Sequence, residues 1–247
     1  MLLVPGVEIN YCNHPVSGWA LTKAFSMKQN RRYIAVLILL AGPFYVNDLA
    51  SIYVKSWQWW LFIDYTAVKL FPFLVVVWLL GRQQMQPCDF GFTAQRPRPF
   101  FLALFIAALA GTLIDQNAYQ LLEKFPGYPP LGGMPAIKSP IWDWIDLTFG
   151  LLVVGVFEEL VFRGFMQTFL SRYTKSAATV VVISAAAFGL AHWGNGLHAV
   201  LITAVIGAVF MTVYLATRSL PALMLAHFVV NFIDFAGVVP KAVFKFY

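Results

Sequence analysis

Residues 147–170 read LTFGLLVVGVFEELVFRGFMQTFL. These 24 residues are enough to cross a bilayer, because a transmembrane helix needs about 20 predominantly apolar residues. Three ionisable residues interrupt the run: Glu158, Glu159 and Arg163. An ionisable side chain inside a membrane is costly and usually marks a functional site. The stretch therefore predicts a membrane-spanning helix with a polar site within it.

The rest of the chain has the composition of a multi-pass membrane protein. Of its 247 residues, 60% are hydrophobic and 11% are charged, whereas a soluble domain is about 45–50% apolar and about 25% charged. The mean hydropathy is +0.72. This composition excludes a water-soluble enzyme, a disordered tail and a disulfide scaffold. The net charge of +6 comes mainly from residues between apolar segments, so we expect no nucleic-acid partner.

The apolar segments predict an all-α fold, a polytopic transmembrane helical bundle. Seven runs are long and apolar enough to span, and an eighth span would require the first 25 residues to enter the membrane. The seven are Tyr33–Tyr53, Trp57–Leu80, Phe100–Leu122, Leu147–Leu170, Ala177–Trp193, Leu197–Thr217 and Leu220–Val239.

Four regions follow from this pattern: an N-terminal segment over 1–32, helices over 33–122, a Pro/Gly-rich loop over 123–140 and a second helical region over 141–240. The loop could cover a site, although such loops more often only connect helices. Eleven Lys and Arg residues fall on the side of the N-terminal segment and five on the other. The positive-inside rule therefore predicts a cytoplasmic N-terminus, and a bacterial source would imply the inner cell membrane.

Helical spacing relates the three ionisable residues of 147–170. Glu159 and Arg163 are four residues apart and share one helix face, so we expect an ion pair. Glu158 points about 100° away from Glu159. One acid thus has a cationic partner while the other faces elsewhere. A structural ion pair at a membrane boundary explains the first acid but leaves the second without a role.

Two further apolar runs carry polar residues. His192 lies late in the fifth run, and His227, Asn231 and Asp234 form one stripe along the seventh. Such groups suit either hydrogen bonds between helices or a water-filled pocket, and the spacing does not choose between them. The helix rise places His192, His227, Asn231 and Glu158 about 11–23 Å from the cytoplasmic ends of their spans. All four therefore fall inside a core about 30 Å thick.

Together these groups could activate water. A carboxylate shielded from bulk solvent can serve as a general base near neutral pH. Histidine and asparagine can donate hydrogen bonds to the oxyanion that forms when water attacks a carbonyl. Glutamate and two histidines could also bind zinc.

The order and spacing of these residues resemble the CPBP family of intramembrane proteases, whose domain is also called ABI. The family includes type II CAAX prenyl endopeptidases and bacterial bacteriocin-processing or immunity proteins. The resemblance covers roughly residues 140–240 and rests on three motifs: Glu158-Glu159-x-x-x-Arg163, Phe188-x-x-x-His192 and His227-x-x-x-Asn231.

The resemblance implies a role for each matched residue. Glu158 corresponds to the glutamate that activates water, and Glu159 to its assisting neighbour. His192 corresponds to the histidine that works with this glutamate. His227 and Asn231 correspond to the pair that stabilises the oxyanion.

Arg163 corresponds in the same family to the structural partner of the acids, and Asp234 is a possible orienting residue. The resemblance implies no metal cofactor, since an asparagine is not needed in a zinc site. If a metal is bound, the expected ligands are Glu158, His192 and His227.

The function expected from this resemblance is an intramembrane endopeptidase that cleaves a membrane protein or lipidated peptide near its terminus. The alternative is a non-catalytic immunity or binding protein on the same fold. A small transporter is a third reading, but it predicts inverted repeats that the sequence lacks. The resemblance assigns no role to Asn47, Asp48, Asp64 or Lys69, for which we expect snorkelling or pairing between helices.

Overall fold

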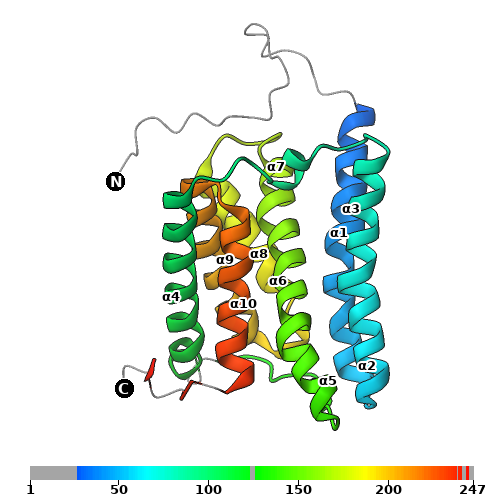
Figure 1. The fold of residues 1–247 in the computed structure, drawn as a ribbon, viewed down its shortest axis with the longest axis vertical. Coiled ribbons are helices and arrows are strands. Elements are labelled where there is room, and N and C mark those ends of the chain that lie inside the picture. Colours follow the sequence, from blue (N-terminus) through cyan, green and yellow to red (C-terminus); the bar gives the residue numbers. More distant parts are fainter. Residues whose placement is uncertain (1–26, 123–125, 238, 241–242, 245–247) are drawn as a thin grey trace, which may run out of the picture.

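The structure is a computed structural model that describes residues 27–122, 126–237, 239–240 and 243–244. Residues 1–26 of the expected N-terminal segment, and 123–125 at the start of the expected loop, therefore lie outside the described residues. The described part of the chain is helical and contains no strand. The predicted all-α bundle is confirmed (Figure 1).

The first half of the bundle consists of three rods. The first rod is α1 (Met27–Tyr53) and the third is α4 (Pro97–Leu122). The second rod is continuous and contains α2 (Trp57–Asp64), the π-helical η1 (Tyr65–Leu70) and α3 (Phe71–Gly81). A 3₁₀ turn, η2 (Pro87–Phe90), lies between α3 and α4.

The second half begins with another continuous rod. It contains α5 (Pro140–Ile145), η3 (Asp146–Gly150), α6 (Leu151–Glu159), η4 (Leu160–Phe165) and α7 (Met166–Leu170), of which η3 and η4 are π-helical. Then follow α8 (Ala177–Leu190), the 3₁₀ turn η5 (Trp193–Asn195), α9 (Leu197–Thr217) and α10 (Leu220–Ala236).

Each of the seven predicted apolar runs coincides with one helical rod, but several boundaries differ. The first, third and fourth rods begin earlier than predicted, at Met27, Pro97 and Pro140, and the second ends one residue later, at Gly81. The fifth run ends at Leu190 instead of Trp193, and the seventh ends at Ala236, where Gly237 takes the left-handed conformation that stops a helix. Four of the rods are long and apolar enough to cross a membrane by themselves. Helix α8 has 14 residues and rises only about 21 Å, less than the hydrocarbon thickness of about 30 Å.

The rod that carries Glu158 and Glu159 lies at the centre of the bundle. In Figure 1, α6 stands between the layer of α1 and α3 on one side and α8, α9 and α10 on the other, with α4 beyond them. Helix α6 packs against α10, and η4 packs against α1. Every residue from Phe157 to Gln167 is buried, so this part of the rod is in protein contact all round.

The outer surface is apolar, as a bilayer requires. Phe73 of α3 and Phe101 and Phe105 of α4 are at least half exposed. Trp59 of α2 and Trp144 of α5 are also exposed, and both helices lie at the same end of the bundle in Figure 1. Aromatic residues gather at membrane–water interfaces. The protein is an integral membrane protein.

The sequence left four polar residues without a role. Three of them, Asn47, Asp64 and Lys69, form pairs with one another in the layer of α1 and the α2–α3 rod. Lys69 forms a buried ion pair with Asp64, and its ammonium lies 4.1 Å from the centre of the Tyr65 ring. The Asn47 amide donates to Asp64 across the α1–α2 contact, at 3.2 Å. The Lys69–Asp64 ion pair lies within one rod, and only the Asn47–Asp64 hydrogen bond is the expected pairing between helices.

Close packing of η4 on η2 gives a stability prediction. A methyl group at Gly164 would collide with the backbone carbonyl of Phe90, whereas one at Gly42 in α1 would meet no atom within 4 Å. We expect Gly164→Ala to lower the free energy of unfolding by about 1–3 kcal/mol. Gly42→Ala, the matched control, should be neutral or stabilising by up to about 1 kcal/mol. Thermal unfolding in detergent measures both, and equal midpoints would contradict the close contact.

Candidate active site

The candidate site lies between α6 and α10, which approach each other closely at Gly155. A methyl group at Gly155 would already touch the His227 Cβ at 3.4 Å. The glycine lies one turn before Glu159 and so brings the carboxylates within reach of His227. Glu159 and Arg163 are completely buried, and Glu158 and His227 are 9% and 8% exposed.

The imidazole of His227 bridges the two adjacent carboxylates. Its Nδ1 lies 2.7 Å from Glu159 Oε1, within hydrogen-bond distance, and its Nε2 lies 3.4 Å from Glu158 Oε2. Glu158, although expected to point about 100° away from Glu159, thus contacts the same imidazole as its neighbour. A histidine presents nitrogens at two corners of its ring, so two acids about 100° apart on one helix can meet the same side chain.

Glu159 also forms the expected ion pair with Arg163, whose Nε lies 3.1 Å from Oε2. The N–H groups of this guanidinium are not directed at an acceptor among the described residues. Its central carbon lies instead 4.1 Å from the Phe188 ring centre and 5.4 Å from that of Phe210. Arg163 is thus held by charge and by cation–π contacts.

The two carboxylates are not equivalent. Both oxygens of Glu159 are engaged, one with His227 and one with Arg163. Glu158 has only the longer contact with His227, and its side chain is 12% exposed whereas that of Glu159 is 0% exposed. Glu158 is therefore the acid with an oxygen available to water or substrate, and Glu159 is the acid that holds His227.

The hydrogen bond to Glu159 also determines which ring nitrogen of His227 faces each acid. An ionised carboxylate only accepts hydrogen bonds, so the Nδ1 proton of His227 is directed at Glu159. The second nitrogen, Nε2, faces Glu158. Nε2 is therefore the ring nitrogen next to the more exposed acid.

His192 lies outside the helix in which it was expected. Helix α8 ends at Leu190, and His192 lies in the turn that follows. Its Nδ1 is 3.0 Å from the Phe188 carbonyl oxygen, which can only accept, so we assign the proton to Nδ1 and leave Nε2 as an acceptor. The Phe188 ring lies between the two imidazoles, 5.0 Å from His192 and 5.9 Å from His227.

The other two predicted residues follow His227 along α10. Asn231 lies one turn later and is half-buried, without a described contact to the carboxylates. Asp234 accepts a hydrogen bond from Gln116 of α4, at 3.2 Å. The described contact of Asp234 thus joins α10 to α4.

The donor geometry does not suit a metal ion. Among the described residues, no three His, Cys, Asp or Glu side chains are arranged to hold one. Both nitrogens of His227 face carboxylates instead.

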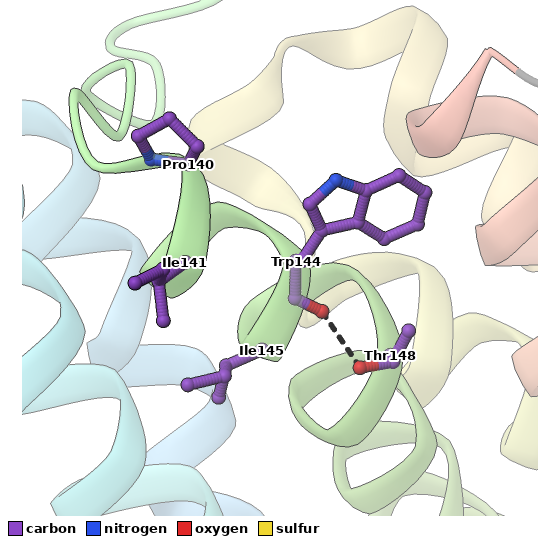
Figure 2. Close-up of a pocket in the computed structure, with 5 residues that line it drawn as sticks. All are labelled: Pro140, Ile141, Trp144, Ile145 and Thr148. Atoms are coloured by element: carbon purple, nitrogen blue, oxygen red, sulfur yellow. Dashed lines mark hydrogen bonds between the residues drawn. The ribbon is translucent and has the colours of Figure 1, made fainter.

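An apolar hollow of about 420 Å³ lies on α5, at the start of the rod that leads to Glu158. Figure 2 shows Trp144 directed to one side of the helix and Ile141 and Ile145 to the other, with the Thr148 hydroxyl donating to the Trp144 carbonyl. The hollow is lined by Pro140, Ile141, Trp144, Ile145 and Thr148, and so by none of the predicted site residues.

The burial of Arg163 gives a second stability prediction. Arg163→Met keeps the length of the side chain but leaves Glu159 without its cation, and breaking a buried pair in this way costs about 3–5 kcal/mol. Arg98→Met, at an exposed arginine, is the matched control and should change stability by less than about 0.5 kcal/mol. Thermal unfolding in detergent measures the difference. If Arg163→Met were as stable as the control, the Arg163–Glu159 ion pair would not be needed for stability.

A comparison with protein families covers the region that carries this site. Residues 140–233 match the family model described as Type II CAAX prenyl endopeptidase Rce1-like. The match starts at the first residue of α5 and contains both carboxylates, Arg163 and both histidines. No curated protein and no solved structure matches the chain. Over residues 140–233 the chain is thus similar to the Rce1-like type II CAAX prenyl endopeptidases, which supports the resemblance to the CPBP family of CAAX-type proteases.

Proposed function

We propose that the protein is an intramembrane endopeptidase in which Glu158 activates the attacking water. The observation that carries this proposal is the His227 bridge between two buried carboxylates, which leaves only Glu158 with an available oxygen. The family match to prenyl endopeptidases supports hydrolysis of a peptide bond. In such a reaction the base must take a proton from water and later return it to the amine that leaves.

Each group has one task in the proposed reaction. Glu158 takes a proton from a water that also bonds to His192 Nε2, and the water oxygen attacks the scissile carbonyl. The protonated Nε2 of His227 and the amide of Asn231 donate to the oxyanion that forms. The C–N bond then breaks as the proton on Glu158 passes to the leaving nitrogen. Glu159 and Arg163 hold His227 in place throughout.

We propose a substrate that reaches the site from within the bilayer. The apolar outer surface and the hollow on α5 suit a hydrophobic helix or a lipidated tail more than a soluble peptide. The substrate is then a membrane-associated or lipidated protein that is cut near its C-terminus, in a CAAX motif or a sorting signal. The charge pattern supports a cytoplasmic N-terminus and, in a bacterium, the inner membrane.

The first test is Glu158→Gln, which removes the base and keeps the shape of the side chain. We expect the cleavage rate to fall about 10²–10⁴-fold. The measurement compares new protein termini by mass spectrometry in membranes that contain the wild type or the variant at equal levels. The control is Asp143→Asn, an acid at the far end of the same rod, which should leave the termini unchanged.

Identical termini in the wild type and Glu158→Gln would contradict proteolysis. That outcome would favour the alternative of a non-catalytic binding or immunity protein.

We also propose that the reaction needs no metal. Cleavage should therefore persist at an unchanged rate after purified protein is treated with EDTA. The measurement is the initial rate with a substrate found in the terminus comparison, before and after chelation. Loss of activity that zinc restores would reject this proposal and favour a site made by Glu158, His192 and His227.

A further inference from the structure

The turn that carries His192 is an irregular segment inside a helical membrane bundle. Helix α8 ends at Leu190, and the chain turns at residues 191–196 before α9 begins at Leu197. The backbone N–H and C=O groups of a buried irregular segment need hydrogen-bond partners outside regular helix. The partners of this turn therefore decide where His192 lies.

Helix α1 supplies the central partner. The carboxylate of Asp48 accepts a hydrogen bond from the Gly194 backbone N–H at 2.6 Å, and both residues are buried. This hydrogen bond pairs the Gly194 N–H, as a buried backbone group requires. Of the four residues to which the resemblance assigned no role, Asp48 is the one that the pairing of Asn47, Asp64 and Lys69 does not explain.

Two more hydrogen bonds join α1 to the same region. The indole N–H of Trp193 donates to the Tyr45 carbonyl at 2.8 Å, and the Tyr45 hydroxyl donates to the Ala187 carbonyl at 2.8 Å. Residues on both sides of His192 are thus tied to one turn of α1. From the other side, the Leu131 N–H of the Pro/Gly-rich loop donates to the Gly194 carbonyl at 2.8 Å.

The contact between the turn and Asp48 leaves no spare room. A methyl group at Gly194 would lie 2.8 Å from the Asp48 Cβ and 3.0 Å from its carboxylate oxygen. Asp48 therefore fixes the backbone two residues after His192.

We propose that Asp48 is a positioning residue for the candidate active site: it holds the Gly194 amide and thereby fixes His192 relative to Glu158. This proposal rests on the proposed function for its effect on catalysis, but the anchoring itself does not depend on any activity. Helix α1 lies outside the region that matches the protease family, so the first half of the chain completes the site of the second.

The first measurement is hydrogen exchange of the 192–196 backbone by mass spectrometry on the full-length protein in detergent. We expect Asp48→Ala to speed exchange in this segment at least tenfold, because the Gly194 amide loses its acceptor. Asp48→Asn should retain most of the protection, since the amide oxygen of asparagine can still accept. The matched control is Asn47→Ala, which removes a hydrogen bond from the neighbouring residue but leaves the turn untouched.

The second measurement is the kinetics of a substrate that the wild type cleaves and Glu158→Gln does not. A displaced catalytic group costs up to about 10²-fold in rate, so we expect Asp48→Ala to lower kcat about 10–100-fold. KM should stay within about twofold, because substrate binding is not the step affected. Asp48→Asn should recover most of kcat, and Asn47→Ala should match the wild type.

Unchanged exchange in Asp48→Ala would overturn the proposal, and so would a wild-type kcat in a variant whose exchange has increased. Equal losses in Asp48→Asn and Asp48→Ala would also overturn it, because asparagine preserves the hydrogen bond. If no substrate is cleaved by the wild type while the exchange results hold, the proposed protease function fails and the anchoring of the turn by Asp48 stands.

Discussion

The structure depends on placing two adjacent carboxylates inside a membrane bundle. A buried acid is tolerated only with a cation or a hydrogen-bond donor beside it, and Glu159 receives both, from Arg163 and His227. Arg163 in turn needs the faces of Phe188 and Phe210. One acid thereby ties α6 and η4 to α8, α9 and α10. The second acid, Glu158, has an available oxygen because its neighbour already has the partners.

The helix that carries these acids differs from an ordinary transmembrane helix. A span in contact with lipid keeps an apolar outer face, whereas residues Phe157–Gln167 are buried on every side. The π-helical η4 begins directly after Glu159, and such wide turns occur often at functional sites because they change the direction of the side chains that follow. Complete burial excludes bulk water from Glu159 and Arg163 and strengthens their attraction.

Local rules predicted much of this molecule. Apolar length located every rod, and the spacing of Glu159 and Arg163 predicted their ion pair, because both depend on residues close in sequence. Helical spacing did not report the shared contact of Glu158 and Glu159 with His227, because His227 approaches from a distant helix. The end of α8 was wrong because apolar residues continue to Trp193 although the helix stops. The link between Asp48 and Gly194 spans 146 residues, and no local pattern reports such a contact.

That separation has a consequence for biogenesis. A ribosome makes α1 long before α8 and α9, so Asp48 enters the bilayer before Gly194 exists. A carboxylate at the centre of a span costs about 2.5–3.5 kcal/mol on insertion scales; Asp48 lies five residues before the end of α1, so its cost is smaller, and it remains until the C-terminal helices arrive. Docking of the later helices relieves it and orders the His192 turn in the same step. An incomplete chain in the membrane would then be both less stable and inactive, so the protein would reach its working form only when synthesis ends.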